Sequence, residues 1–199
     1  MRTSELALAS RERLVEILTR AFVDDPAWVA LGHPSRRRRE RIMRLTFSGE
    51  VRRARRWGSH SRASLAGDGR AVGVAIAYPS AVWRKPHYSA VYELAALLGG
   101  PGAFMRGLQF NTAAERLHPS TPHVYLALLA VDPADQGVGI GSAILGEVIE
   151  ASAGLPVYLE TARADNVAFY EARGFQVQGE AALARDGRLW GLSRPPAPT

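Results

Sequence analysis

Cysteine is absent from the 199-residue chain, and Lys85 is its only lysine. Without thiols the chain can form no disulfide, no thiolate metal site and no cysteine acyl-enzyme. The N-terminus lacks the apolar core of a signal peptide, and no uncharged apolar run approaches the roughly 18 residues of a membrane span. The histidines show no metal-ligand spacing. We therefore expect a soluble, cytoplasmic protein without a metal site or a membrane partner.

The positive charge is concentrated in one segment. Residues 36–56 hold ten arginines and two glutamates, a local balance of +8, whereas the whole chain carries +6. We interpret the segment as the solvated face of a helix, with its apolar residues turned inward: Ile42, Met43, Leu45 and Phe47. Attraction of an anionic ligand or nucleic acid is the alternative. Because stacking aromatics and a recognition-helix module are lacking, we expect no nucleic-acid partner.

The stretch 123–141, HVYLALLAVDPADQGVGIG, is where we expect the functional site. Val124 to Val131 is apolar and β-favouring, which predicts a buried strand, and Asp132-Pro133 ends it because proline cannot donate to a ladder. Gln136 and three alternating glycines follow, and a helix is predicted from Ser142 to Ala153. A glycine loop before a helix N-terminus lets backbone N–H groups surround a phosphate. The stretch therefore predicts an anion cradle.

A dinucleotide fingerprint is one alternative for this cradle. Gly139-x-Gly141 could open it, with Glu160 about twenty residues later as the ribose ligand. Its third small residue is replaced by Ile144, however, and residues 161–199 are too few for the remaining βαβ units. The sequence therefore disfavours a doubly wound dinucleotide-binding fold.

The rest of the chain shows strands and helices without strict alternation, which predicts a mixed sheet with helices on both faces. Ser10 is a candidate N-cap, and Gly67-Asp68-Gly69 is a candidate hairpin turn. The expected strands are 5–9, 59–65, 70–78, 155–161, 175–178 and 189–192. The expected helices begin after Ser10 and cover 90–98, 103–117 and 166–173, the last ended by Gly174, while a loop contains Trp28.

Two motifs give the chain a resemblance to a known family. Gln136 to Gly141 fits Gln/Arg-x-x-Gly-x-Gly/Ala, and residues 166–175, NVAFYEARGF, follow at a suitable separation. Both are similar to motifs of the GNAT superfamily of N-acetyltransferases. Further stretches, AFVDDPA at 21–27 and LET at 159–161, resemble its puromycin N-acetyltransferase-like members.

The resemblance implies an α+β (mixed α/β) fold. We expect a GNAT-like, mixed and largely antiparallel twisted sheet of about seven strands, flanked by helices. Residues 1–193 would form a single domain, and the proline-rich tail 194–199 is typical of a disordered segment. The family contains monomers and homodimers, and both remain open here.

The resemblance also implies direct acetyl transfer from acetyl-CoA to a primary amine of a small molecule, such as an antibiotic. The Val131 N–H would donate to the thioester oxygen, and Tyr170 would be the general acid that reprotonates the thiolate. Both could instead be core residues, and Asn166 could cap a helix. The implied cofactor-binding residues are Leu129, Ala130, Val131, Gln136, Gly137, Val138, Gly139, Ile140, Gly141, Ser142, Asn166, Phe169 and Tyr170.

The group that takes the proton of the amine is not identified by the motifs. The candidates are Asp24, Asp25, Glu93, Glu115, His118 and Glu160. Asp25 stands where the puromycin-type members carry an aromatic hydroxyl in the acceptor pocket. A carboxylate there would favour a cationic amine and could act as its base. A protein N-acetyltransferase and a non-catalytic acyl-CoA-binding module are the alternative functions.

Overall fold

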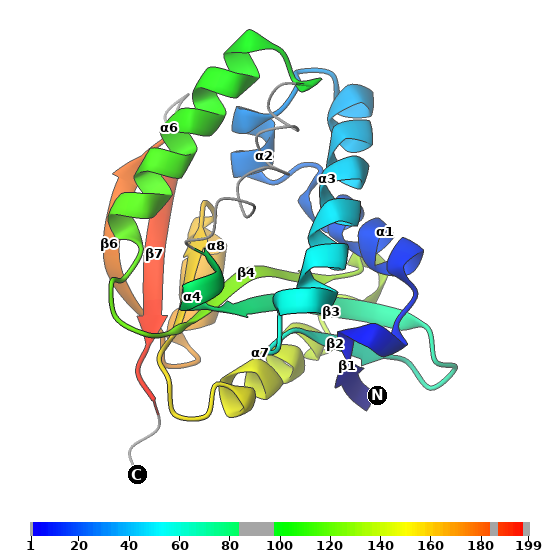
Figure 1. Cartoon of the computed structure of the whole chain (residues 1–199). Helices are drawn as coiled ribbons and strands as arrows, with labels where there is room; N and C mark the ends of the chain where they lie inside the picture. Colours follow the sequence, from blue (N-terminus) through cyan, green and yellow to red (C-terminus); the bar gives the residue numbers. More distant parts are fainter. Residues whose placement is uncertain (1, 84–97, 184–186, 197–199) are drawn as a thin grey trace.

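A seven-stranded sheet organises the chain in the computed structural model, which describes residues 2–83, 98–183 and 187–196 (Figure 1). The strand order is β1-β2-β3-β4-β5-β7-β6. Neighbouring strands are antiparallel, except that β4 and β5 run parallel. The predicted α+β fold with a mixed, largely antiparallel sheet is therefore confirmed.

The elements have the following bounds. The strands are β1 (Arg2–Glu5), β2 (Arg62–Leu65), β3 (Ala71–Pro79), β4 (Val124–Val131), β5 (Val157–Thr161), β6 (Gln176–Ala182) and β7 (Arg188–Arg194). The α-helices are α1 (Arg11–Phe22), α2 (Pro26–Leu31), α3 (Arg36–Trp57), α4 (Ser80–Trp83), α6 (Pro101–Leu117), α7 (Ile140–Ala151) and α8 (Ala164–Glu171). Two 3-10 turns are η1 (Leu6–Leu8) and η3 (Pro133–Asp135).

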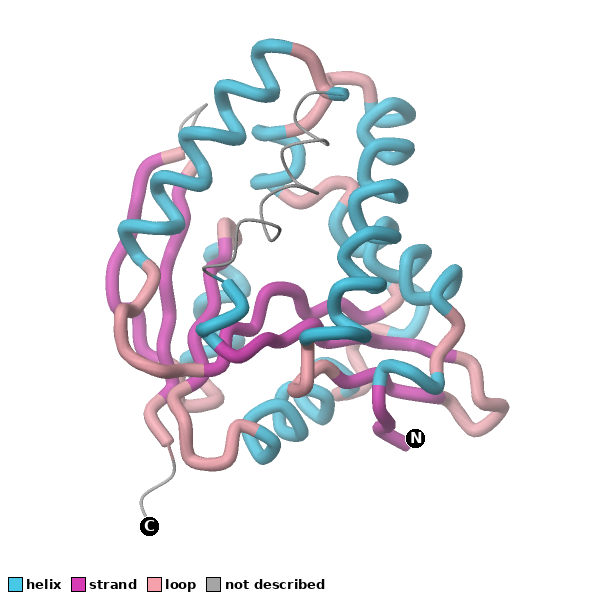
Figure 2. The backbone as a smooth tube through the Cα atoms, viewed as in Figure 1, coloured by secondary structure: helices cyan, strands magenta, loops and turns pink. Residues whose placement is uncertain are grey.

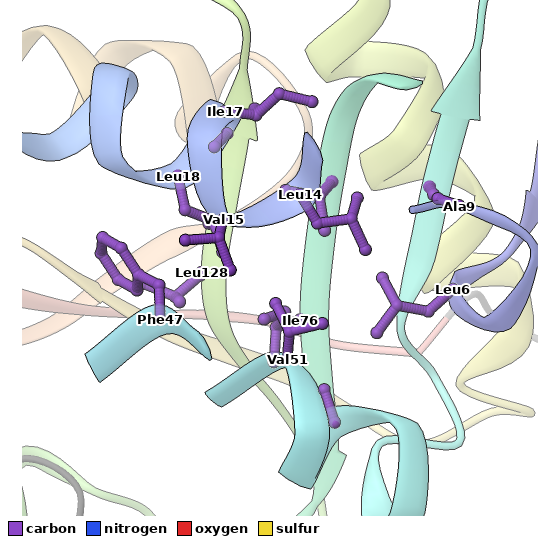
Figure 3. Packing of buried hydrophobic residues seen from close by; sticks show 14 of the residues in the cluster. Leu6, Ala9, Leu14, Val15, Ile17, Leu18, Phe47, Val51, Ile76 and Leu128 are labelled. Atoms are coloured by element: carbon purple, nitrogen blue, oxygen red, sulfur yellow. The ribbon is translucent and has the colours of Figure 1, made fainter. Parts of the chain in front are cut away.

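The helices cover both faces of the sheet (Figures 1 and 2). On one face, α1 and α3 pack on β3 and β4, and Figure 3 shows Leu14 and Leu18 of α1 beside Ile76 of β3 and Val51 of α3. On the other face, α7 packs its apolar side on the alternate residues of the same strands. Because both faces of β3 are covered, eight of its nine residues are buried. The buried double-sided strand explains its almost unbroken apolar sequence.

Several local predictions are confirmed. The Arg13 N–H donates to Ser10 Oγ at 3.3 Å, so Ser10 caps α1. Gly69 has φ of +82° in the hairpin turn between β2 and β3, where the Ala66 N–H donates to the Arg70 carbonyl. The predicted strand 124–131 has the same bounds as β4. None of the described helices is long and apolar enough to cross a bilayer.

Two predictions near the N-terminus are wrong. The first strand is β1 rather than 5–9, because β2 begins at Arg62 opposite Glu5 and offers no ladder partner beyond it. The segment with Trp28 is helix α2 rather than a loop. Asp25 caps that helix, since the Ala27 N–H donates to Asp25 Oδ1 at 2.9 Å, and Pro26 occupies its first position. The predicted helix 90–98 lies, except for its last residue, outside the described residues.

The arginine segment forms α3, and its outer face is solvated as predicted. Met43 and Phe47 are fully buried, but Leu45 is 64% exposed, which corrects our prediction for this residue. Two positions from Met43 turn a side chain to the opposite side of a helix. Arg39 and Arg53 are buried instead, and Arg39 Nε donates to a carbonyl at the end of α1 at 2.8 Å. The remaining arginines of the segment are exposed: Arg36, Arg37, Arg38, Arg41, Arg44, Arg52, Arg55 and Arg56.

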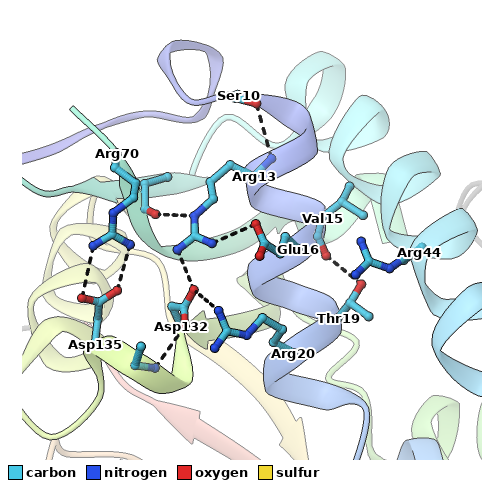
Figure 4. Close-up of polar contacts among 12 residues, drawn as sticks. Ser10, Arg13, Val15, Glu16, Thr19, Arg20, Arg44, Arg70, Asp132 and Asp135 are labelled. Carbon is cyan, nitrogen blue, oxygen red and sulfur yellow. Dashed lines mark hydrogen bonds and ion pairs between the residues drawn. The ribbon is translucent and has the colours of Figure 1, made fainter. Parts of the chain in front are cut away.

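A buried carboxylate ties α1 to the end of β4 (Figure 4). Asp132 is 1% exposed and accepts from Arg13 at 2.5 Å and from Arg20 at 3.1 Å. Its other oxygen accepts from the Ala134 N–H at 3.0 Å and caps η3. Although burial opposes ionisation, the Ala134 N–H and the two guanidinium groups hold the pKa of Asp132 below its usual range. Asp132 therefore fixes the point at which the chain leaves β4 for the glycine loop.

We expect Asp132→Asn to lower the free energy of unfolding by about 1–3 kcal/mol at pH 7, because two cations lose a buried partner and both are partly screened by water. Asparagine keeps the cap of η3. Since the pKa of Asp132 is lowered by folding, its contribution is present above the unfolded pKa and lost as the pH falls through the folded one. Denaturant unfolding should therefore show a constant deficit between about pH 7 and 5 that shrinks below about pH 4.

The matched control is Asp135→Asn, which removes an ion pair with Arg70 whose side chain is 45% exposed. We expect that variant to cost less than about 1 kcal/mol. Equal effects of the two substitutions, or a deficit of Asp132→Asn that persists at pH 3, would contradict the role given to Asp132.

Candidate active site

The parallel strands β4 and β5 separate after a short paired stretch. They pair only at Val124 with Val157 and at Tyr125 with Tyr158. By contrast, β4 stays paired with β3 from Val124 to Val131, except at Ala127, where the register shifts. The Asp132 N–H donates to the Val72 carbonyl on β3. Because neighbouring residues of a strand point their backbone groups to opposite edges, Leu129 and Val131 present theirs toward the gap beside β5. The structure thus leaves an open backbone edge on β4 where the pantetheine contacts were predicted.

The glycine loop that follows has the geometry of an anion cradle. Gly137 and Gly139 both have φ of +84°, and a Cβ at either would meet no atom within 4 Å. Gly139 caps α7 without a side-chain bond, and the first helical hydrogen bond runs from the Ala143 N–H to the Gly139 carbonyl. The N–H groups of Ile140, Gly141 and Ser142 therefore stay available for a ligand at the helix N-terminus.

Helix α7 begins two residues earlier than predicted. Ile140 lies in its first turn with its side chain 6% exposed in the core, so only its backbone can face a ligand. Val138 is 75% exposed at the tip of the loop. A Cβ at Gly141 would lie 3.6 Å from Val131 Cγ2 and 3.9 Å from Phe169 Cζ, so this glycine joins loop, strand and α8 at ordinary packing distance.

Gln136 connects the loop to the open edge of β4. Its Nε2 donates to the Val131 carbonyl at 3.1 Å. This bond uses the carbonyl of Val131 and leaves its N–H for another partner. Gln136 therefore orients the loop through the strand rather than by pointing its side chain into the cradle.

Arg173 is a site residue that our sequence analysis did not single out. Its Nε and Nη2 donate to Ser142 Oγ at 3.2 and 2.5 Å, and its guanidinium lies 3.7 Å from the centroid of the Phe169 ring. A cation is therefore held beside the first turn of α7, where the cradle opens. The sequence shows a basic residue within the second motif, but its approach to Ser142 depends on the tertiary fold.

The short helix α8 places Tyr170 and Asn166 on the same cavity wall. Tyr170 is buried, and its hydroxyl donates to no described residue. Burial raises the pKa of Tyr170, against the nearby Arg173 charge, which lowers it. Asn166 Nδ2 donates to Thr161 Oγ1 at 3.2 Å, and the N-cap of α8 is Arg163. The proposed capping role of Asn166 is therefore wrong.

The wall with Tyr170 bounds a cavity of about 590 Å³, within the size range of small-molecule sites. It extends from the gap between β4 and β5 to helices α2, α3 and α6. Arg106 holds α6 against the end of α2 by donating to the Ala30 and Gly32 carbonyls. Aromatic residues form much of its lining: Phe22, Trp28, Phe104, Phe110, Tyr125 and Tyr170. The cavity is thus a largely apolar chamber whose wall includes Asn166 and Tyr170 of the second motif.

The candidate proton acceptors separate into two groups. The cavity brings together Asp25, Glu115, His118 and Glu160, although they come from different elements. Asp24 is 65% exposed and paired with Arg36, so it lies outside the cavity, and Glu93 lies outside the described residues. In the part of the chain that is described, no group of three or more His, Asp or Glu side chains could hold a metal ion.

Asp25 has a structural role as the N-cap of α2. Its Oδ1 caps α2, and burial raises its pKa against the Ala27 and Trp28 N–H groups and the Arg163 charge. A carboxyl whose pKa is raised by folding adds stability at low pH and loses it as the pH rises through the folded pKa. At pH 7 the Asp25 charge therefore destabilises the fold relative to a neutral residue of the same shape.

We accordingly expect Asp25→Asn to raise the melting temperature at pH 7, since asparagine keeps the cap and removes the buried charge. The gain should disappear near pH 3, where the carboxyl is protonated in both states. Asp25→Ala, which removes the cap as well, should lower the free energy of unfolding by about 1 kcal/mol relative to Asp25→Asn. Thermal unfolding at both pH values measures these differences. A lower melting temperature for Asp25→Asn at pH 7 would contradict this assignment.

Comparisons with known proteins agree with this geometry. Residues 86–177 match the family model of the acetyltransferase (GNAT) domain. A Corynebacterium glutamicum structure described as histone acetyltransferase HPA2 and related acetyltransferase is 24% identical, with a TM-score of 0.70 over 95% of this chain and 92% of that one. Arylalkylamine N-acetyltransferase 2 from Aedes aegypti is 13% identical, with a TM-score of 0.69 over 98% of both chains.

A third structure with this fold is the Drosophila melanogaster polyamine N-acetyltransferase. It is 12% identical, with a TM-score of 0.57 over 98% of both chains. At these identities the likenesses show the fold, and the family model adds the domain. Residues 86–177 therefore match the GNAT acetyltransferase domain, in agreement with the resemblance of the two sequence motifs, and the chain as a whole shares the fold of these acetyltransferases.

Proposed function

We propose that the chain transfers acetyl directly from acetyl-CoA to a primary amine of a small molecule. The observation that carries this proposal is the meeting of three features in one place: the open edge of β4, the glycine cradle and the buried Tyr170. Leu129 of β4 and Tyr170 line the apolar cavity, and a Cβ at Gly141 of the glycine loop would lie 3.6 Å from Val131 and 3.9 Å from Phe169.

The residues of the site fit coenzyme A. The cradle offers N–H groups from the first turn of α7 to a pyrophosphate, and a Cβ at Gly137 or Gly139 would occupy otherwise open space there. Arg173 adds a cation beside it. We assign the pyrophosphate to Gln136–Ser142 and the pantetheine to Leu129–Val131, with Asn166, Phe169 and Tyr170 at its sulfur end. When bound, acetyl-CoA supplies an activated acetyl group.

Two groups of this chain would then serve the reaction. The Val131 N–H would donate to the thioester oxygen as negative charge develops on it. The carbonyl of Val131 is already bound by Gln136, so the N–H is the backbone group of Val131 that is left for a ligand. Tyr170 would give its proton to the departing sulfur. A phenol is protonated at neutral pH, and burial raises the pKa of Tyr170 further, so the proton is present in the resting site.

The cavity supports a small amine as acceptor. Its aromatic lining suits an apolar body, and Asp25, Glu115 and Glu160 suit a cationic nitrogen. The names of the Aedes and Drosophila proteins, which specify arylalkylamines and polyamines, are consistent with this choice for a shared fold. The finer resemblance to puromycin-type enzymes stays a prediction, as does the cytoplasmic location.

An acceptor screen tests the proposal. Purified protein is mixed with acetyl-CoA and a panel of arylalkylamines, polyamines, aminonucleosides and peptides with a free N-terminus or lysine, and thiol release is measured. We expect turnover with one class of small amines. Turnover with the peptides alone would instead support a protein N-acetyltransferase, and acetyl-CoA binding without any turnover would support a binding module.

A further inference from the structure

Three polar side chains form a buried hydrogen-bonded row at the end of the cavity. His118 Nδ1 lies 3.4 Å from Glu160 Oε1, and His118 Nε2 lies 3.0 Å from His123 Nε2. The side chains of His118 and Glu160 are 4% and 6% exposed, and His123 is 2% exposed. His123 Nδ1 in turn lies 2.7 Å from the Thr121 carbonyl. Such a buried polar row between apolar layers needs every proton to have a defined place.

The Thr121 carbonyl determines where the protons lie. A carbonyl can only accept, so His123 Nδ1 carries a hydrogen, and neutral His123 presents an accepting Nε2. His118 Nε2 must then donate. Its Nδ1 faces the Glu160 oxygen, and two acceptors cannot share a hydrogen bond without a proton between them. The three hydrogen bonds of the row therefore need one proton more than two neutral imidazoles and a carboxylate carry. With His123 neutral, this proton belongs to the pair of Glu160 and His118, either as carboxylic acid or as imidazolium.

We infer that Glu160 and His118 form the proton acceptor for the amine, with His123 as the positioning residue that fixes the tautomer of His118. This inference rests on the proposed function. Glu160 and His118 both line the cavity that contains Tyr170, whereas His123 lies behind them. The accepting form is the one that has lost the shared proton. Acetylation should therefore rise with pH as that proton leaves.

The proton balance of the reaction is complete. A cationic amine loses two protons as its nitrogen bonds to the acetyl carbon and the carbon–sulfur bond breaks. One goes to the Glu160–His118 pair and then to water. The other replaces the proton that Tyr170 gives to the sulfur. The products are a neutral amide, a thiol and one released proton.

The surroundings of the pair are aromatic or more distant from it. The rings of Tyr125 and Tyr158 lie 5.0 and 4.9 Å from the His118 ring. Burial, the Glu160 charge and the interaction of the Tyr158 hydroxyl with the Glu160 side chain raise the pKa of Tyr158. Among the described residues of the cavity wall, the other titratable or charged groups are Asp25, His33, Arg39, Glu115, Tyr125 and Tyr170. Glu115 is exposed, and Asp25 already caps α2. The pair is thus the buried acceptor with the most defined geometry in the described cavity.

Kinetics with a matched pair of amines tests the inference. The probes are 2-phenylethylamine and its 2,2-difluoro analogue, which has nearly the same shape and a much less basic nitrogen. We expect Glu160→Gln to lower kcat/KM for 2-phenylethylamine by about 10²-fold at pH 7 and to remove the rising limb of the pH profile. The fluorinated amine binds largely in its neutral form, so Glu160→Gln should lower kcat/KM for this amine by about tenfold or less.

Two control variants separate the pair from general charge effects. Glu115→Gln changes the cavity charge without touching the row, so it should raise KM for the cationic amine and keep the rising limb. Glu147 lies on the exposed side of α7, so Glu147→Gln should change neither KM nor the rising limb of the pH profile. Retention of the limb in Glu160→Gln, with turnover intact, would overturn the inference while leaving the proposed function in place. Loss of the limb in Asp25→Asn instead would make Asp25 the acceptor.

The tautomers of His118 and His123 can be measured by NMR without any turnover, which tests the hydrogen-bonded row directly. In ¹⁵N-histidine-labelled protein, His118→Gln and His123→Gln identify the two rings. We expect His123 to carry its hydrogen on Nδ1 and His118 on Nε2, with the His118 Nδ1 signal shifting in Glu160→Gln. The opposite tautomers would overturn the row even if no amine of the panel is acetylated, an outcome that on its own would count against the proposed function.

Discussion

Tyr170→Phe should lower kcat by about 10²–10³-fold and leave the affinity for acetyl-CoA within about threefold of the original value. The substitution removes only the hydroxyl, and the ring keeps its contacts with Phe169 at 5.1 Å and with Phe175 at 5.4 Å between centroids. Burial raises the pKa of Tyr170, so the proton is present at neutral pH and is the property that the variant loses. Steady-state kinetics and calorimetric titration measure the two effects separately.

Thermal unfolding is the control for this variant. The Tyr170 hydroxyl donates to no described residue, so its removal breaks no hydrogen bond of the described fold, and we expect an unchanged or slightly higher melting temperature. An unaltered kcat would show that Tyr170 is a core aromatic without a chemical role. A large loss of stability would show that the hydroxyl has a structural partner.

Gly139→Val should weaken acetyl-CoA binding by 30-fold or more. Gly139 has φ of +84°, a conformation that costs a β-branched residue roughly 1–2 kcal/mol or more. A Cβ there meets no protein atom within 4 Å, so the new side chain would occupy only the space assigned to the pyrophosphate. Strain and obstruction of the cradle therefore act together on the same ligand.

Two further variants separate these causes. Gly139→Asn tolerates a positive φ, so it should retain stability but still obstruct the cradle and weaken binding. Gly146→Ala lies within the same helix, also with no atom within 4 Å of its Cβ, and should raise stability by about 0.5–1 kcal/mol without affecting binding. Full affinity in Gly139→Asn would mean that strain alone explains Gly139→Val and that the ligand lies elsewhere.

Arg173→Gln should weaken acetyl-CoA binding by about tenfold and reduce its salt dependence, because a guanidinium beside the α7 N-terminus would contribute a charge-assisted contact to the anion. Arg173→Lys keeps the charge and should recover part of the affinity. Calorimetry at low and high salt measures both variants. An affinity that is unchanged at low salt would remove Arg173 from the cofactor site.

The local motifs of the sequence predicted the strand, the loop and the helices at the centre of the candidate site. The strand from Val124 to Val131, the glycine loop and the helix with Tyr170 each depend on residues that are close in sequence, so their patterns suffice. The predicted start of α7 lies two residues after the observed one, because a glycine such as Gly139 can either extend a loop or cap a helix. Only its left-handed backbone distinguishes the two.

The remaining site residues meet only through the fold. Arg173 reaches Ser142 across 31 positions, and His118 reaches Glu160 across 42. In the sequence, each of these residues looks like an ordinary surface charge. Glu115 and Asp24 were equally plausible candidates, and the structure places both at the surface. Asp132 likewise reads as a strand terminator, and its partners on α1 lie more than a hundred positions away. Long-range pairs of this kind require the sheet order before they can be named.

An amide-resolved titration of ¹⁵N-labelled protein with coenzyme A is the most direct measurement of the cofactor site. We expect saturable binding, with the largest amide shifts at Gly137 to Ser142 and at Leu129 and Val131. Absence of binding, or saturation with shifts confined to other parts of the chain, would show that the loop between β4 and α7 does not hold the pyrophosphate and would contradict the roles assigned to Val131 and Tyr170.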